Sequence, residues 1–186
     1  NDSTEAIKPT PKIFPIDIFI QKLWELNSRT GNSHCSRSRI ISSEEEIVLW
    51  ETIIEKSLES IPLLNISETS KAVSHSYHLV KQWLLDELEQ ENSSCNFTKK
   101  DAIVFSHWKQ RFQERCDKKG IITLVDAIIS LINLINSGEI KHLPKRTILV
   151  NFHESPPLYQ KLFDVLPRSI YITTGNASSR IREKTK

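Results

Sequence analysis

The stretch ILVNFHESPPLYQKLFDVL occupies residues 148–166, and SIYIT follows it at residues 169–173. An apolar run over residues 147–152 predicts a buried strand, and Pro156 begins an amphipathic helix that extends to residue 166. Strand, short helix and strand predict a β-α-β unit, whose two strands lie parallel. Two strands form only part of a sheet, so we expect further strands outside the chain or near residues 12–14.

Upstream of this unit, helical periodicity dominates. Apolar residues at helical spacing predict helices over residues 16–26, 43–61, 67–91, 99–119 and 123–137. Ser43, with Glu46 three residues later, predicts a capping box at the start of the second of these helices. The helix over residues 123–137 is apolar nearly all round, so we expect it to lie at the centre of the fold. The fold class predicted is α/β, predominantly α-helical.

These patterns divide the chain into four parts. We expect an extended N-terminal segment over residues 1–15, a helical subdomain over residues 16–143, a β-α-β fragment of a parallel sheet over residues 144–175 and a disordered basic tail over residues 176–186. Because the chain contains no methionine, we interpret it as a piece of a longer protein.

Charge is unevenly distributed, although the net charge is only +2. Residues 43–60 contain six glutamates and one lysine, whereas residues 99–119 contain seven basic and three acidic residues. A basic second half indicates a face that can meet a phosphate backbone, and solvated helix faces are the alternative interpretation. The candidate DNA contacts are the basic residues of the loop after the first helix and of the helix over residues 99–119: Arg29, Arg37, Arg39, Lys99, Lys100, Lys109, Arg111, Lys118 and Lys119.

Catalytic and metal-binding motifs are missing from the sequence. The four glycines form no GxxxxGK[ST] loop, and there is no GxSxG elbow. His75 and His78 are spaced for one helix face, but we interpret them as surface histidines instead of zinc ligands. We therefore expect no enzymatic activity, metal, cofactor or small-molecule substrate.

The remaining sequence features concern packing and location. Each of the four tryptophans lies on or beside an apolar helix stripe, which favours core packing over stacking on bases. The three cysteines are far apart and form no CxxC pair, which favours a reducing compartment. The longest apolar run is interrupted by polar residues and is too short to span a bilayer. We expect a cytoplasmic protein with no membrane partner.

The end of the strand over residues 147–152 has the layout of a Walker B strand in P-loop ATPases. In that motif an Asp-Glu pair holds Mg²⁺ and orients water. Here Val150 and Asn151 occupy the strand end, and His153 and Glu154 lie in the turn. We interpret these four residues as a degenerate Walker B motif, in which Glu154 is an acid near a helix N-terminus.

A family resemblance rests on the order of several short motifs. They are Thr10-Pro11-Lys12-Ile13-Phe14-Pro15, Leu49-Trp50-Glu51, Gln82-Trp83, Phe105-Ser106-His107-Trp108, Leu143-Pro144 and the block over residues 148–166. In this order they resemble the bacterial "probable DNA repair protein" family, which is similar to the AddB and RecC subunits of helicase–nuclease complexes. The resemblance covers residues 9–175. That family has Gly-Phe-Asp-Glu where this chain has Asn151-Phe152-His153-Glu154.

The resemblance implies an inactivated superfamily-one helicase scaffold. Residues 16–140 would be the helical 1B-like insertion of its first motor domain, and residues 146–173 a return to that domain's sheet. The expected function is a non-catalytic scaffold of a DNA repair or recombination protein. It would contact DNA independently of sequence, or a partner helicase–nuclease subunit. The alternatives are a helical protein–protein interaction module without DNA affinity, and an ATPase or nuclease subunit whose catalytic segments lie outside the chain.

Overall fold

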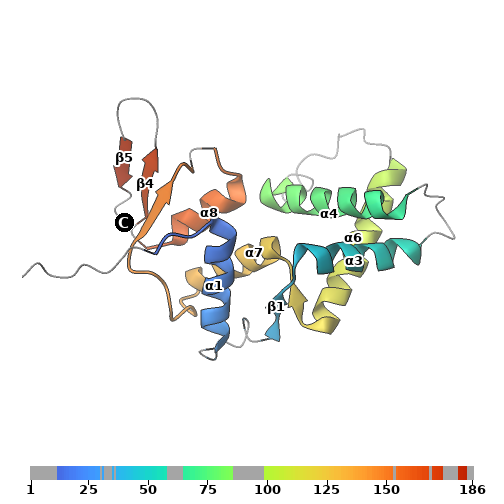
Figure 1. Cartoon of the computed structure of the whole chain (residues 1–186), viewed down its shortest axis with the longest axis horizontal. Helices are drawn as coiled ribbons and strands as arrows, with labels where there is room; N and C mark the ends of the chain where they lie inside the picture. The colour runs from blue at the N-terminus through green and yellow to red at the C-terminus, as the bar shows by residue number, and fades with distance from the viewer. Residues whose placement is uncertain are drawn as a thin grey trace, which may run out of the picture.

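The computed structural model describes residues 12–29, 31, 35, 37–57, 65–85, 99–152, 154–167, 169–173 and 180–183. Over these residues the chain is predominantly helical, with six helices and two small sheets (Figure 1). The helices are α1 (Ile16–Arg29), α3 (Ser43–Glu55), α4 (Ile66–Gln82), α6 (Lys99–Lys119), α7 (Leu124–Asn136) and α8 (Pro157–Val165). The strands are β1 (Arg39–Ile40), β2 (Ile121–Ile122), β3 (Thr147–Val150), β4 (Ser169–Thr173) and β5 (Arg180–Glu183).

The helix starting near residue 43 has its capping box one residue earlier than predicted. Ser42 is the N-cap: its hydroxyl accepts a hydrogen bond from the Glu45 N–H, and the Glu45 carboxylate accepts one from the Ser42 N–H, both at 3.2 Å. The run Ser-Ser-Glu-Glu-Glu permits either register. The observed register places Glu46 on the buried face of α3, where hydrogen-bond donors from α3 and α4 surround it.

Two predicted helix ends also differ from the structure. α3 ends at Glu55, six residues before the predicted end, and residues 58–61 lie outside the described part of the chain. α4 ends at Gln82 because Trp83 is its C-cap and Leu84 adopts a left-handed conformation (φ 56°), which interrupts the helix. Residues 86–91, where the prediction continued this helix, are outside the described residues.

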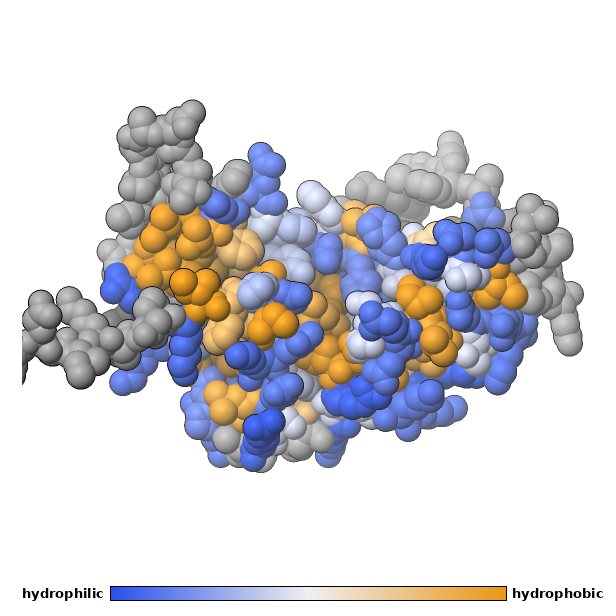
Figure 2. Space-filling model, in the orientation of Figure 1, coloured by the Kyte–Doolittle hydropathy of each residue, from blue (hydrophilic) through white to orange (hydrophobic). Residues whose placement is uncertain are grey.

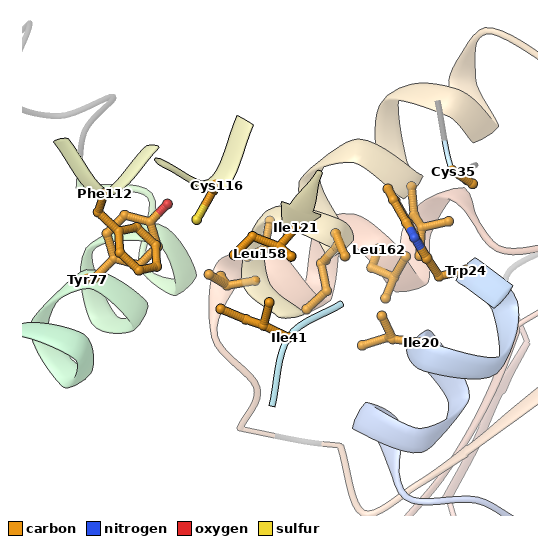
Figure 3. Close-up of a cluster of buried hydrophobic side chains, with 14 of the residues drawn as sticks. Ile20, Trp24, Cys35, Ile41, Tyr77, Phe112, Cys116, Ile121, Leu158 and Leu162 are labelled. Carbon is orange, nitrogen blue, oxygen red and sulfur yellow. The ribbon is translucent and has the colours of Figure 1, made fainter. Parts of the chain in front are cut away.

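One continuous core joins the helices to the β-α-β unit. Trp50 of α3, Tyr77 of α4 and Phe112 of α6 form an aromatic cluster, with the Trp50 and Phe112 rings stacked at 3.9 Å. The core continues through α7, which packs against α1, α4 and α8, to Leu158 and Leu162 of α8 (Figure 3). The central position predicted for this helix is confirmed.

Three of the four tryptophans, Trp24, Trp50 and Trp108, are buried, as predicted. Trp83 is an exception, since its side chain at the end of α4 is half exposed. None of the described helices combines the length and the apolar character needed to cross a membrane.

The larger sheet has the strand order β3-β4-β5. β3 and β4 are parallel and are connected through α8, which confirms the predicted β-α-β unit. β5 pairs antiparallel with β4, so the disordered tail predicted for residues 176–186 is wrong for residues 180–183. Ile181 is the only apolar residue in that strand, so its sequence signal is weak, and backbone pairing with β4 decides its conformation. Residues 12–14, suggested as a further strand, are irregular.

A second sheet, which the sequence did not predict, consists of the two-residue strands β1 and β2 in parallel. It brings the segment around Arg37 against Gly120 at the end of α6. Gly120 has φ +59°, and a Cβ at that position would lie 2.8 Å from the Arg37 carbonyl oxygen. Glycine is therefore required at position 120 both by its backbone conformation and by the close approach of the other strand.

Replacing Gly120 by alanine is expected to lower the free energy of unfolding by about 2–3 kcal/mol, from the left-handed conformation and the displaced carbonyl. Gly138→Ala is the matched control, because Gly138 has φ +75° but open space around its Cβ position. Gly138→Ala should lower the free energy of unfolding by about 1 kcal/mol, because alanine is strained in the left-handed conformation but meets no neighbouring atom. Urea unfolding of both variants measures the difference. Equal losses would show that the contact with Arg37 contributes nothing.

Candidate nucleic-acid interface

The helix register of α6 gathers several of its basic residues on one face. Positions 100, 107, 111 and 118 are separated by seven, four and seven residues, so they lie on one side of the helix. We call Lys100, His107, Arg111 and Lys118 the basic stripe. The side chains of His107, Arg111 and Lys118 are exposed, whereas Trp108, Phe112 and Cys116 anchor the opposite side of α6 in the core.

The basic stripe extends about 27 Å along the helix axis, at 1.5 Å per residue. Arg115, half buried, borders it on one side. Glu114 borders it on the other side and accepts a hydrogen bond of 3.1 Å from the Gln110 amide. The stripe is therefore a row of basic residues, and the Glu114 carboxylate beside it accepts a hydrogen bond from the same helix.

The other basic positions predicted on this helix are distributed around it. By the same register, Lys99, Lys109 and Lys119 each lie on a different face from the basic stripe. Lys109 is half buried, and Lys119 is exposed at the end of α6. The structure thus divides the six predicted lysines and arginines of α6 into three that share a face and three that do not.

The predicted arginines before α3 lie at the far end of α6. The N–H of Arg39 donates to the Gly120 carbonyl at 3.0 Å, which brings Arg39 and its neighbour Arg37 near Lys118 and Lys119. The Arg39 guanidinium forms two hydrogen bonds of 2.7 Å with the Glu45 carboxylate. These bonds, with the Ser42 N–H, lower the pKa of Glu45 to about 2, and they raise the pKa of Arg39.

This ion pair means that the Arg39 charge already has a carboxylate partner at the surface. Arg29, at the end of α1, lies 3.8 Å from Glu25 one turn earlier, whereas Arg37 is exposed. Of the three predicted loop arginines, Arg37 is consequently the one best placed to add charge to the end of the basic stripe.

The degenerate Walker B residues occupy the end of β3 and the turn after it. Val150 is the last strand residue, and Asn151 follows in a left-handed conformation (φ 62°) with its N–H bonded to the Ile172 carbonyl at 2.9 Å. Glu154 is exposed in the turn, and His153 lies outside the described residues. Among the described residues no three His, Cys, Asp or Glu side chains are grouped to hold a metal ion.

A buried polar cluster between α3 and α4 was missed by the sequence analysis. The Glu46 carboxylate accepts hydrogen bonds from Trp50 Nε1 at 3.3 Å and Ser74 Oγ at 2.7 Å, and His78 Nε2 lies 3.0 Å from both of its oxygens. The surface position predicted for His78 is wrong, since its side chain is only 26% exposed, whereas His75 is exposed as predicted. The sequence signal for this cluster was the position of Glu46 four residues before Trp50, which places the acid on the buried face of the same helix.

Burial and hydrogen bonding shift the pKa values of Glu46 and His78 in opposite directions. Burial pushes the pKa of Glu46 up, but the hydrogen bonds and charge of His78, with Ser74 and Trp50, outweigh it and leave that pKa lowered. Burial pushes the pKa of His78 down, but the bonds and charge of Glu46, with the charge of Asp126, leave it raised. Both shifts favour the charged form of each group, as in an ion pair between α3 and α4.

Asp126 of α7 holds a second polar cluster beside the first. It accepts hydrogen bonds from Tyr77 Oη at 2.6 Å and Thr123 Oγ1 at 2.7 Å, and Lys81 Nζ lies 3.4 Å away. Burial, together with the charge of Asp126, raises the pKa of Tyr77. Both clusters join helices across the core, so we interpret them as structural.

Two cysteines of the described part of the chain, Cys35 and Cys116, are buried. Burial raises the pKa of Cys35 to about 11 and that of Cys116 to about 12, which keeps both thiols protonated at neutral pH.

Comparison of the chain with models of known protein families, with curated proteins and with solved structures gives no match. By helical register, the face of α6 that holds Lys100, Arg111 and Lys118 gathers more of the predicted basic residues than any other face of that helix.

Proposed function

We propose that this chain is a non-catalytic, helicase-like scaffold segment of a DNA repair or recombination protein, and that it contacts the DNA backbone through the basic stripe of α6. The observation that carries the proposal is the shared face of Lys100, His107, Arg111 and Lys118. A row of basic side chains on a helix that is anchored in the core matches a polyphosphate backbone without reading base edges.

The β-α-β unit supports the scaffold part of the proposal. β3, α8 and β4 have the order of a Walker B strand, the helix after it and the next parallel strand in P-loop motor domains, and the end of β3 carries no Asp-Glu pair. We infer that this unit is a degenerate remnant of such a sheet and that the helices before it form the 1B-like insertion. Under this proposal, α6 would guide DNA or dock a partner helicase–nuclease subunit, and catalysis would belong to other segments.

DNA binding is tested by fluorescence anisotropy of labelled single- and double-stranded DNA, titrated with the full chain over a range of salt concentrations. We expect weak binding of both, with log K falling linearly with log salt. The slope counts the phosphate contacts at about 0.7 per contact for single strands and about 0.9 for duplex. No binding at low salt would contradict the proposal.

A charge-reversal pair locates the contact. Lys100→Glu with Lys118→Glu removes two cations of the basic stripe, so affinity at low salt should fall at least about tenfold and the salt slope should lose about 2 units. Lys99→Glu with Lys119→Glu is the matched control, since it makes the same exchanges one residue away, in the same first and last turns of α6. Equal losses in the two variants would show that net charge, and not the stripe, drives binding.

A second candidate function is a protein–protein interaction module. The observation that favours it is a group of exposed apolar side chains, Leu79, Trp83 and Leu85, at the end of α4. This function predicts no salt-dependent DNA affinity and a partner interaction that is lost in Trp83→Ala. The anisotropy titration separates the two candidates, because only the first requires a phosphate contact.

A further inference from the structure

β3 is an apolar strand at the edge of the larger sheet, and no described strand covers its outer edge. β3 pairs only with β4 among the described strands, so its other edge is open in the part of the chain that the structure describes. Ile148 and Val150 are 55% and 49% exposed, although they are large apolar residues in a parallel pair, which is normally covered on both faces. Figure 2 shows hydrophobic surface over the strands at this end of the molecule.

Alternate residues of β3 direct their backbone N–H and C=O groups toward β4 and toward the open edge of the sheet. The Asn151 N–H donates to the Ile172 carbonyl of β4, so residues 147, 149 and 151 direct their backbone groups toward β4. The N–H and C=O groups of Ile148 and Val150 therefore point to the open edge. Leu149, on the opposite face, is buried in the core under α8.

Natural edge strands are protected from pairing by charged residues, proline or a bulge. β3 has the sequence Thr-Ile-Leu-Val and contains no charged residue or proline, and its register with β4 is continuous. The flanking charges are basic before the strand, at Lys145 and Arg146, and acidic after it, at Glu154.

We propose that β3 pairs antiparallel with β3 of a second copy of this chain about a two-fold axis, joining the two sheets edge to edge. With the axis at Leu149, Ile148 lies opposite Val150 of the partner subunit, and the outward N–H and C=O groups of both residues are satisfied. This register is self-complementary, as a two-fold interface requires. It places Lys145 and Arg146 of one copy at the end of β3 in the other, before the turn that contains Glu154.

Sedimentation velocity of the full chain over a micromolar concentration series measures the association. We expect a reversible dimer whose dissociation constant rises at least about tenfold in Val150→Lys, since a lysine at the edge blocks pairing. Val48→Lys is the matched control, because Val48 is 59% exposed on α3, away from the sheet, and this variant should dimerise normally. Far-UV circular dichroism confirms that each variant is folded.

Mixing variants tests the register. Val150→Lys mixed with Ile148→Glu should restore dimers, because the two new charges lie directly opposite each other in the proposed pairing. Val150→Lys mixed with Val150→Glu should not restore dimers, because position 150 of one copy lies diagonal to position 150 of the other and not opposite it. A monomer at all concentrations, equal effects of Val150→Lys and Val48→Lys, or equal rescue by both mixtures would overturn the proposal.

Discussion

Replacing Phe112 by alanine is expected to lower the free energy of unfolding by about 3–5 kcal/mol. Phe112 is fully buried, stacks on Trp50 with ring centroids 3.9 Å apart, and meets the Tyr77 ring edge-on at 5.4 Å. Removing its ring deletes the aromatic contacts of α6 with Trp50 of α3 and Tyr77 of α4 and leaves a cavity between three helices. Those helices cannot close the cavity without shifting against α7.

Urea unfolding, followed by circular dichroism and by tryptophan fluorescence, measures this loss. Phe105→Ala is the matched control, because Phe105 lies on the same helix but is only partly buried. It should cost about 1–2 kcal/mol, in proportion to the smaller apolar area that it removes from water. A Phe112→Ala variant no less stable than Phe105→Ala would mean that the aromatic cluster is not the anchor of α6.

The helices of this fold could be predicted from sequence because their apolar stripes repeat at helical spacing. The helix over residues 99–119 was predicted with its observed bounds, and Thr123 and Ser137 are the caps of α7. β1 and β2 could not be predicted, since two-residue strands have no periodicity and form only because the chain before α3 passes beside Gly120. The capping box was predicted one residue too late because the sequence permits Ser42 with Glu45 or Ser43 with Glu46. Contacts of Glu46 with α4 decide between them, and the sequence does not show those contacts.

The basic stripe follows from helical spacing along residues 99–119, but the sequence analysis grouped those residues by composition and did not apply that spacing. The excess of basic residues in α6 is visible in the sequence, and helical register divides these residues between the basic stripe and the other faces of the helix. The pairing of Arg39 with Glu45 was not foreseen, because it requires the chain to turn between β1 and α3. Whether the stripe binds DNA is an expectation that the binding titrations above test.

Replacing His78 by alanine is expected to lower the free energy of unfolding by about 3–5 kcal/mol at about pH 6, because it leaves the buried Glu46 carboxylate without its charged partner. His75→Ala is the matched control, since His75 is an exposed histidine one turn earlier on α4, and it should change stability by no more than about 0.5 kcal/mol. Urea unfolding of the two variants side by side measures the difference. A small loss in His78→Ala would show that Ser74, Trp50 and water suffice to hold the Glu46 charge.

The pH dependence of stability follows from the directions of the two pKa shifts. The folded-state pKa of His78 is raised, so its contribution is complete below its ordinary value of 6.5 and is lost as pH rises through the folded value. The folded-state pKa of Glu46 is lowered, so its contribution is complete above its ordinary value of 4.5 and is lost as pH falls through the folded value. The ion pair should therefore stabilise the fold most between about pH 4.5 and pH 6.5.

Single replacements should reverse these slopes, which distinguishes an ion pair from general loosening of the core. In Glu46→Gln, His78 keeps only the smaller effect of the Asp126 charge, so burial lowers the pKa of His78 and its contribution should increase as pH rises from 5 to 7 instead of decreasing. In His78→Ala, burial raises the pKa of Glu46, so stability should increase as the carboxylate is protonated at acid pH. Stability curves measured by urea unfolding from pH 4 to pH 8 show both reversals if Glu46 and His78 are charged together in the folded protein. Parallel curves for wild type and both variants would instead mean that the contact is a neutral hydrogen bond.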